Sequence, residues 1–298
     1  MKYALYPGCV AEDSCKELGM SMQLIAKKLG IDLVEIKDAT CCGSGYLHAY
    51  NRDLSLFLNG RTFALAEKAG ADTLIVICSL CLLALEKVNT DLSSDPELLE
   101  RTNERLRRVG LHYSGRIKVK HLLQVLVEDI GLDNIAKKVK TPLDLNIAPF
   151  YSCQLLRPPD MHSFDDANNP QTLDSLIKAL GGRPVDFPGK TKCCGFHLLM
   201  VNEDIALNMS GKHLKDAKEC GADCLVVPCP CCHLVFDMYQ PRIEKKLGMS
   251  LKIPILHLPQ MIGLALGFKP QELGLNRHII DPLPVVTGQK TKKARATG

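Results

Sequence analysis

The chain has 298 residues, of which 46% are hydrophobic, and a formal net charge of +4. This length allows one large domain or two of about 150 residues each, and the apolar content excludes an intrinsically disordered protein. Four of the positive charges (Lys290, Lys292, Lys293 and Arg295) lie at the C-terminus, so the rest of the chain is neutral and offers no surface for nucleic acid.

The N-terminal stretch "MKYALYPGC" lacks the apolar core of a signal peptide. No apolar run approaches the 18 or so residues that cross a bilayer. We therefore expect a cytoplasmic protein with no direct membrane span. In a reducing compartment, 14 cysteines indicate metal binding or redox chemistry rather than structural disulfides.

Short apolar runs alternate with helical patterns in the first half of the chain. The run "KYALY" leads into Cys9 and the run "TLIVI" leads into Cys78, with a helical pattern from Ser55 to Lys68 between them. The segment from Asp95 to Val139 is charged, helical in pattern and poor in β-branched runs. It is therefore predicted to be a helical connector.

The second half repeats this order. "NIAPFY" precedes Cys153, "CLVV" precedes Cys229, and a helical pattern from Glu203 to Glu219 lies between them. "KIPIL" and "LPQMIGLALGF" predict a last strand and helix. "HIIDPLPVV" is too rich in proline for a central element, so we expect it to form an arm that lies on a neighbouring protein and helps a complex to assemble.

The two halves are related by a duplication. "KAGADTLIVICSLCLLALE" aligns with "ECGADCLVVPCPCCHLVFD" at an offset of 151 residues. The alternation of strands and helices predicts an α/β fold, with a small, mostly parallel sheet and flanking helices in each half. We expect a first domain over residues 1–140 including the connector, a second over 141–288 including the arm, and a basic disordered tail over 289–298.

Ten cysteines follow one pattern in both halves: a single cysteine, an adjacent pair before glycine, and a CxxC. The first set is Cys9, Cys41, Cys42, Cys78 and Cys81, and the second set is Cys153, Cys193, Cys194, Cys229 and Cys232. A structural zinc ion or a cubane cluster takes four protein ligands, and adjacent side chains diverge. Five thiolates with a doublet therefore favour a polynuclear iron-sulfur centre in each half, with zinc binding or simple packing as the alternatives.

These motifs, together with "YPGC", "CCGSG", "CQLLRP" and "KTKCCGF", resemble those of the CCG-domain family. Nearly the whole chain resembles the B subunit of heterodisulfide reductase and its bacterial and sulfur-oxidiser relatives. The resemblance implies two CCG domains related by a pseudo-twofold axis, each holding one non-cubane [4Fe-4S] cluster on its five cysteines.

The resemblance also implies an activity and partners. The activity is cleavage or formation of a disulfide between the two clusters, with one electron passing through each. The implied partners are a C-type iron-sulfur protein with cubane clusters, a flavin-bearing A-type protein, and a small disulfide or thiol substrate. An alternative function is a non-catalytic electron-transfer component of a complex that oxidises succinate or lactate, and a zinc or thiol-exchange protein is a third.

Two positions depart from the family pattern. Ser152 replaces the glycine expected before Cys153, and "CPCC" adds Cys231 inside the second CxxC. Cys231 is an alternative to Cys229 as a ligand of the second cluster. The repeat alignment favours Cys229, because it places Cys231 opposite Leu80.

Two histidines lie within six residues of the doublets. His48 and His197 are candidate proton donors to the thiolate products, because imidazole titrates near neutral pH. The alternative is that each donates a hydrogen bond to sulfur or lines the fold. Cys15, Cys220 and Cys224 have no cysteine at the equivalent repeat position and are predicted to be packing residues.

Overall fold

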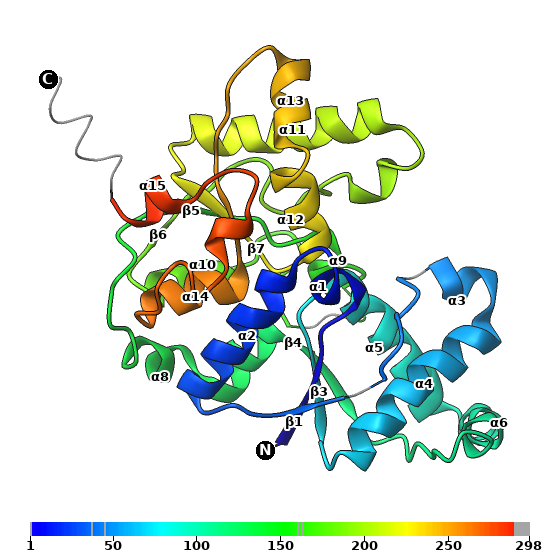
Figure 1. The fold of residues 1–298 in the computed structure, drawn as a ribbon. Helices are drawn as coiled ribbons and strands as arrows, with labels where there is room; N and C mark the ends of the chain where they lie inside the picture. The colour runs from blue at the N-terminus through cyan, green and yellow to red at the C-terminus, as the bar shows by residue number, and fades with distance from the viewer. Residues whose placement is uncertain (1, 37, 45, 160, 162–163, 289–298) are drawn as a thin grey trace, which may run out of the picture.

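The computed structural model describes residues 2–36, 38–44, 46–159, 161 and 164–288. It contains two four-stranded sheets with helices packed around them (Figure 1). The strand order is β2-β1-β3-β4 in the first sheet and β6-β5-β7-β8 in the second. All neighbouring strands are parallel. The predicted α/β fold and its duplication are therefore confirmed, while the predicted tail, 289–298, lies outside the described residues.

The first sheet is built around two central strands with apolar sequences. Its strands are β1 (Lys2–Tyr6), β2 (Asp32–Glu35), β3 (Thr73–Val76) and β4 (Lys118–His121). Every residue of β3 is buried, because helices cover both faces of a parallel sheet. The helices of this half before the connector are α1 (Cys9–Glu12), α2 (Lys16–Leu29), α3 (Tyr46–Tyr50), α4 (Arg52–Lys68) and α5 (Ser79–Ser94).

The second sheet repeats the arrangement. Its strands are β5 (Asn146–Pro149), β6 (Arg183–Pro184), β7 (Cys224–Val227) and β8 (Ile255–His257). The helices and 3-10 turns are α9 (Cys153–Leu156), α10 (Thr172–Ala179), η2 (Phe196–Leu198), α11 (Glu203–Glu219), α12 (Pro230–Asp237), α13 (Gln240–Leu247), α14 (Leu258–Ala265), η3 (Leu275–Arg277) and α15 (Leu283–Val286). The equivalent helices α4 and α11 begin in the same way, since Asn51 and Asn202 each accept a hydrogen bond from a backbone N–H of the first turn.

The prediction of a helical connector from Asp95 to Val139 is wrong in one respect. The segment contains α6 (Pro96–Arg107), α7 (Leu122–Gln124), a π-helical turn η1 (Val125–Ile130) and α8 (Leu132–Ala136), but also β4, which pairs with β3 and completes the sheet. Its sequence, "KVKH", is polar because β4 lies at a partly exposed edge. The repeat carried a usable signal: "HLLQ" at 121–124 matches "HLPQ" at 257–260, where the last strand of each sheet meets its helix.

The two halves pack through reciprocal pairs of helices. Helix α5 of the first half contacts α9 of the second, and α1 contacts α12 in the equivalent way, while α2 packs on α14 (Figure 1). Because α1 and α9 follow equivalent strands, as do α5 and α12, the contacts obey the predicted pseudo-twofold relation. This junction brings the carboxyl ends of the central strands of both sheets together.

The C-terminal segment packs on its own chain. Val285 of α15 is 4% exposed, and Val286 lines a cavity together with Leu143, Leu264 and Phe268. Part of "PLPVV" is therefore covered within the second half, and the expectation that the segment forms an arm onto a neighbouring protein stays a prediction. In the part of the chain that the structure describes, no helix combines the length and the apolar character that a membrane crossing requires.

Candidate functional site

The single cysteine of each set begins a short helix directly after the first strand of its sheet. The residues before these cysteines, Gly8 and Ser152, have φ of 77° and 65°. A Cβ atom on Gly8 would lie 3.2 Å from the Sγ atom of Cys81. In the second half the Cys232 thiol donates a hydrogen bond of 3.6 Å to the Ser152 hydroxyl. The serine that departs from the family pattern therefore places a hydroxyl against a thiol of the second set.

The two CxxC motifs meet at the junction of the halves. Cys78 and Cys229 are the residues directly before α5 and α12, close to the ends of β3 and β7, and both are buried. Their Sγ atoms lie 3.8 Å apart. Cys81 and Cys232 lie three residues further on, so each faces the same side of its helix as the first cysteine of its motif. Equivalent residues of the two sets thus share one buried contact.

The cysteine doublets lie in loops, and in each loop a backbone N–H group donates a hydrogen bond to the sulfur atom of one doublet cysteine. The backbone N–H of Ser44 donates to the Sγ atom of Cys42 at 3.4 Å, and that of Gly195 donates to Cys193 at the same distance. Gly195 has φ of 86°, and a Cβ atom there would lie 3.1 Å from the carbonyl oxygen of Ala206. Glycine after the doublet therefore allows the loop to pack against α11.

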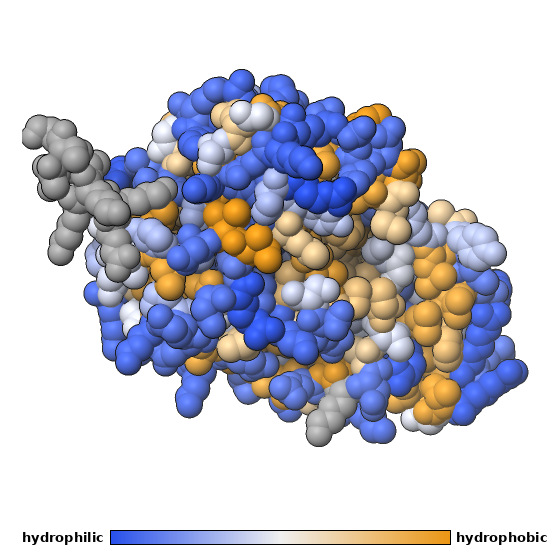
Figure 2. Space-filling model, turned by 45° about the horizontal axis from the view of Figure 1, so that its top comes forward, coloured by the Kyte–Doolittle hydropathy of each residue, from blue (hydrophilic) through white to orange (hydrophobic). Residues whose placement is uncertain are grey.

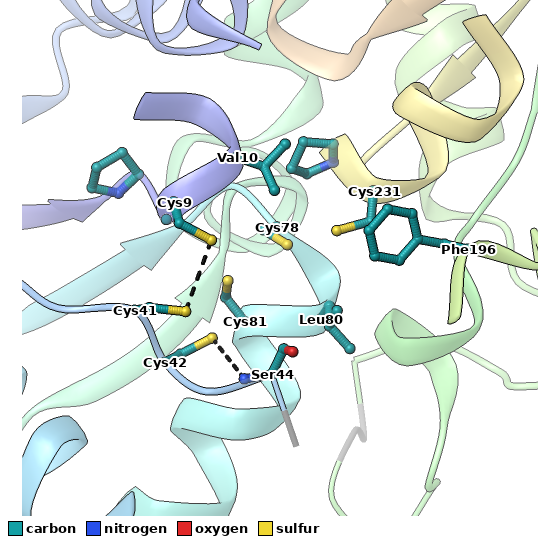
Figure 3. Close-up of a pocket in the computed structure, with 13 residues that line it drawn as sticks. Cys9, Val10, Cys41, Cys42, Ser44, Cys78, Leu80, Cys81, Phe196 and Cys231 are labelled. Carbon is teal, nitrogen blue, oxygen red and sulfur yellow. Dashed lines mark hydrogen bonds between the residues drawn. The ribbon is translucent and has the colours of Figure 1, made fainter. Parts of the chain in front are cut away.

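A cavity of about 200 Å³ lies within the first set (Figure 3). All five cysteines of the first set line it, and the Sγ atoms of Cys9 and Cys41 are 3.8 Å apart. The other lining residues are Pro7, Gly8, Val10, Ser44 and Leu80 from the first half, and Phe196, Pro230 and Cys231 from the second. Among these described lining residues, none is Asp, Glu, Lys, Arg or His.

The thiols of the second set also form a continuous group. Cys153 is hydrogen-bonded to Cys193, and Cys194 is hydrogen-bonded to both Cys193 and Cys232. Cys229 interacts with Cys232 and connects this group to Cys78 of the first set. All five predicted residues of the second set are therefore neighbours in the folded chain.

Both sets contain thiols whose ionised form is stabilised by neighbouring groups, and Cys42 and Cys193 are one example from each set. Hydrogen bonds from Cys41 and then Cys81 lower the pKa of Cys42 to about 3. Hydrogen bonds from Cys153 and Cys194 lower the pKa of Cys193 to about 2. Buried thiols that share protons are suitable metal ligands, because the thiolate is the form that binds metal. The soft donor set and the cavity of about 200 Å³ fit a polynuclear iron-sulfur centre in the first half.

Cys231 lies beside the first set. It lines the cavity, and its Sγ atom and those of Cys78 and Cys229 all lie within 4.8 Å of one another. Leu80, the residue at the equivalent repeat position, lines the same cavity. The alternative that Cys231 replaces Cys229 as a ligand of the second cluster stays a prediction, because Cys229 belongs to the same close group.

The two candidate histidines occupy different surroundings. The Nε2 atom of His48 lies 3.7 Å from a carboxylate oxygen of Asp91, and burial, followed by the charge of Lys87, lowers the pKa of His48. Neither His48 nor His197 is among the residues that line the cavity. The Nδ1 atom of His197 contacts the hydroxyl of Tyr46 across the junction. Tyr46 is a site residue that the sequence did not identify, since its role depends on the other half.

The three cysteines predicted to be packing residues differ in burial. Cys15 and Cys224 are buried, which agrees with the prediction of a packing role. Cys220 is exposed at the end of α11, so the same prediction is wrong there.

Comparison with protein families matches the duplicated region. Residues 3–86 and 147–237 match the cysteine-rich domain CCG, and residues 196–279 match the HdrB-like C-terminal domain. These segments contain all ten cysteines of the two sets.

Similar proteins share almost the whole chain. It is 36% identical, over 94% of its length and 97% of the relative, to the 8-methylmenaquinol:fumarate reductase membrane anchor subunit of Wolinella succinogenes. It is 33% identical, over 94% of both chains, to the B subunit of the ferredoxin/F(420)H(2)-dependent CoB-CoM heterodisulfide reductase of Methanosarcina acetivorans. A crystal structure of a hypothetical protein from Helicobacter pylori matches 94% of this chain and 52% of its own, with a TM-score of 0.77 and 22% identity, which shows a common fold alone.

Proposed function

We propose that this chain, which belongs to the CCG cysteine-rich-domain family and to its HdrB-like branch, is the catalytic component of a heterodisulfide reductase-type complex. The proposed reaction is the cleavage or formation of a disulfide. In this proposal each set of five cysteines holds one non-cubane [4Fe-4S] cluster. The observation that carries it is the contact of Cys78 with Cys229, whose Sγ atoms lie 3.8 Å apart. Two complete thiol sets converge on one junction.

Two adjoining thiol sets match the number of electrons that the proposed reaction needs. Cleaving a disulfide takes two electrons, and a single one-electron donor would release a high-energy thiyl radical halfway. When bound, the two clusters supply one electron each and iron that binds sulfur. The chain's own contribution is to hold the two sets against each other, through α5 on α9 and α1 on α12, so that both sulfur atoms of a substrate are reached together.

The cavity lining indicates which part of a substrate enters. Its walls are apolar side chains such as Val10, Leu80 and Phe196, in addition to thiols. An ionised substrate group placed there would lose its hydration without gaining a partner. We therefore propose a small disulfide or thiol whose carbon chain is uncharged next to sulfur, with any charged group left outside the cavity.

Thiolate products need protons, and His197 is the better placed of the two candidate donors. It follows the doublet of the second set and contacts Tyr46, whose side chain is 61% exposed. The pair therefore connects the neighbourhood of Cys193 with solvent. Neither histidine lines the cavity, but His48 is held against Asp91 whereas His197 lies close to the second doublet, so we assign the proton-donating role to His197.

Electrons must reach the site from a partner, because the sequence has no dinucleotide-binding fingerprint. We propose a C-type iron-sulfur protein with cubane clusters and a flavin-bearing A-type protein, in a cytoplasmic complex. Large apolar side chains are exposed after both doublets: Tyr46, Tyr50 and Leu54 in the first half, and Met200, Val201 and Ile205 in the second. Figure 2 shows apolar side chains bordering a hollowed part of one face, which supports a protein partner there.

The test is to purify the protein without oxygen and measure its metal and its turnover. Two [4Fe-4S] clusters predict about eight irons and eight acid-labile sulfides per chain. With a reduced viologen as electron donor, we expect consumption of small disulfides and release of thiols. Zinc, or four or fewer irons, in a carefully anaerobic preparation would contradict the proposal.

A second function is favoured by one comparison. The identity of 36% to the membrane anchor subunit of the Wolinella succinogenes fumarate reductase supports the alternative function, an electron-transfer or anchoring role in a complex that acts on succinate or fumarate. A protein with that role would hold clusters that reduced viologen reduces, but it would not turn over disulfides. The same preparation therefore separates the two functions.

A further inference from the structure

One thiol near the site belongs to neither set of five. Cys231 and Leu80 stand at equivalent positions of the two CxxC motifs, directly before the last cysteine, and both line the cavity of the first set (Figure 3). The two halves therefore contribute different side chains to the cavity at this repeat position. The first half contributes an inert apolar side chain, and the second half contributes a thiol.

The position of Cys231 is well defined by its backbone. It lies in the first turn of α12, next to Pro230, whose ring fixes the start of the helix. Its side chain is 6% exposed, and its Sγ atom lies within 4.8 Å of those of Cys78 and Cys229. Three residues of the second half close the cavity: Phe196, Pro230 and Cys231. Among these three described residues, Cys231 alone carries an atom that binds metal.

We propose that Cys231 is a sixth thiol ligand of the first centre, supplied across the junction by the second half. The inference rests on the proposed function, because it requires an iron-sulfur centre on the first set. A buried thiol that faces five others across one cavity is a soft donor placed beside a soft metal centre. The two halves would then hold the first centre jointly, whereas Leu80 has no ligand atom to offer.

A ligand role for Cys231 would affect the binding of external thiols. Cys231 approaches the first centre from the second half, the side on which a substrate sulfur atom must lie if it is to be shared between the two centres. An incoming thiolate would therefore compete with the Cys231 thiolate for the same iron. Removal of Cys231 should leave that position open and raise the affinity for added thiols.

The test compares four proteins purified without oxygen: wild type, Cys231→Leu, Cys231→Ser and Cys220→Ser. Cys231→Leu copies the residue that the first half has at this position, and Cys220→Ser removes an exposed cysteine outside both sets. For each protein we would measure iron content, the electron paramagnetic resonance spectrum after reduction, and the change of that spectrum during a titration with 2-mercaptoethanol. Circular dichroism and melting temperature would monitor folding.

We expect Cys231→Leu to alter the signal of one centre and to bind 2-mercaptoethanol about tenfold more tightly than wild type, a gain of roughly 1.4 kcal/mol. Cys220→Ser should match wild type. A folded Cys231→Leu protein that loses about half of its iron would equally support a ligand role. If Cys231→Leu does not fold, Cys231→Ser, with a weaker oxygen donor, is judged by the same measurements.

Spectra and thiol affinities that are identical in wild type and the folded Cys231 variants would overturn the inference. Its failure is distinguishable from that of the proposed function. Absence of iron from wild type refutes the proposed function before any variant is compared, whereas a wild type with about eight irons and an unaffected variant refutes the Cys231 ligand alone.

Discussion

The Sγ atoms of Cys78 and Cys229 lie 3.8 Å apart, although 151 residues separate them along the chain. Each residue stands where the third strand of its half ends and a helix begins. Because the carboxyl ends of the central strands of both sheets face one junction, the duplication produces a pair of adjoining thiol sets rather than two distant copies. The chemistry proposed for the chain depends on that proximity.

The two sets should lose metal independently. We expect Cys42→Ala and Cys194→Ala, which change buried doublet cysteines of the first and second sets, each to remove about half of the iron, and the double variant to remove nearly all of it. The measurement is iron and acid-labile sulfide per chain in anaerobic preparations.

The matched control is Cys224→Ala, because Cys224 is fully buried in β7 but outside both sets. It should reduce the free energy of unfolding by about 1–2 kcal/mol, as deletion of a small buried group does, and keep all of the iron. Full iron retention by Cys42→Ala would remove that residue from the first set.

The positive φ values before the single cysteines give a second prediction. Gly8 has φ of 77° and ψ of 155°, a conformation that costs other residues about 1–3 kcal/mol. Gly8→Ala would also place a Cβ atom 3.2 Å from the Sγ atom of Cys81. We expect lower stability and faster loss of iron to a chelator.

The control is the equivalent position in the second half. Ser152→Gly relieves the strain at φ 65° but removes the hydroxyl that accepts the Cys232 hydrogen bond. These two effects oppose each other, so the melting temperature should change by less than in Gly8→Ala. Equal effects of the two variants would show that backbone strain does not distinguish the two positions.

A buried contact between a carboxylate and a histidine connects the halves away from the thiols. Glu17 of α2 and His257, at the start of α14, approach to 3.3 Å. Burial would raise the pKa of Glu17, but the hydrogen bond and charge of His257 outweigh it, and the pKa lies below the ordinary value of 4.5. Because the folded-state pKa is lowered, the stabilisation is present above pH 4.5 and is lost as the pH falls below it.

We therefore expect Glu17→Gln to reduce the free energy of unfolding by roughly 3 kcal/mol at pH 7, because His257 would be left buried without its partner. Arg277→Ala, which removes a half-exposed contact of the same carboxylate, should cost less than about 1 kcal/mol. Urea unfolding of both variants and of Glu17→Gln/His257→Gln gives the coupling energy. A coupling near zero would mean that the pair does not hold the halves together.

The last helix, α15, provides a test of the C-terminal segment. Val285 is buried on its own chain, so Val285→Ala should reduce stability by about 1–2 kcal/mol, and truncation after Ile280 should lower the melting temperature further. Exposed Thr287→Ala, in the same segment, is the control. If truncation leaves the melting temperature unchanged and weakens only the binding of a partner, the segment is a docking arm after all.

The strands that were predicted from sequence are those whose residues are buried on both faces of the sheet. Runs such as "KYALY" and "CLVV" are apolar because they form the central strands, and alternation with helical patterns predicts a parallel sheet. The edge strands β2, β4 and β6 escaped prediction, because an edge is partly solvated and tolerates "DLVE", "KVKH" and a two-residue strand. The duplicated "HLxQ" motif was the one sequence signal for β4.

The sequence by itself determined the duplication, the fold class and the membership of two cysteine sets, since these depend on residue type and spacing along the chain. Only the tertiary structure decided that Cys231 faces the first set, that His197 meets Tyr46, and that neither candidate histidine lines the cavity. The physical reason is that spacing places residues within one half, whereas contacts between halves depend on how α2 packs on α14 and α5 on α9.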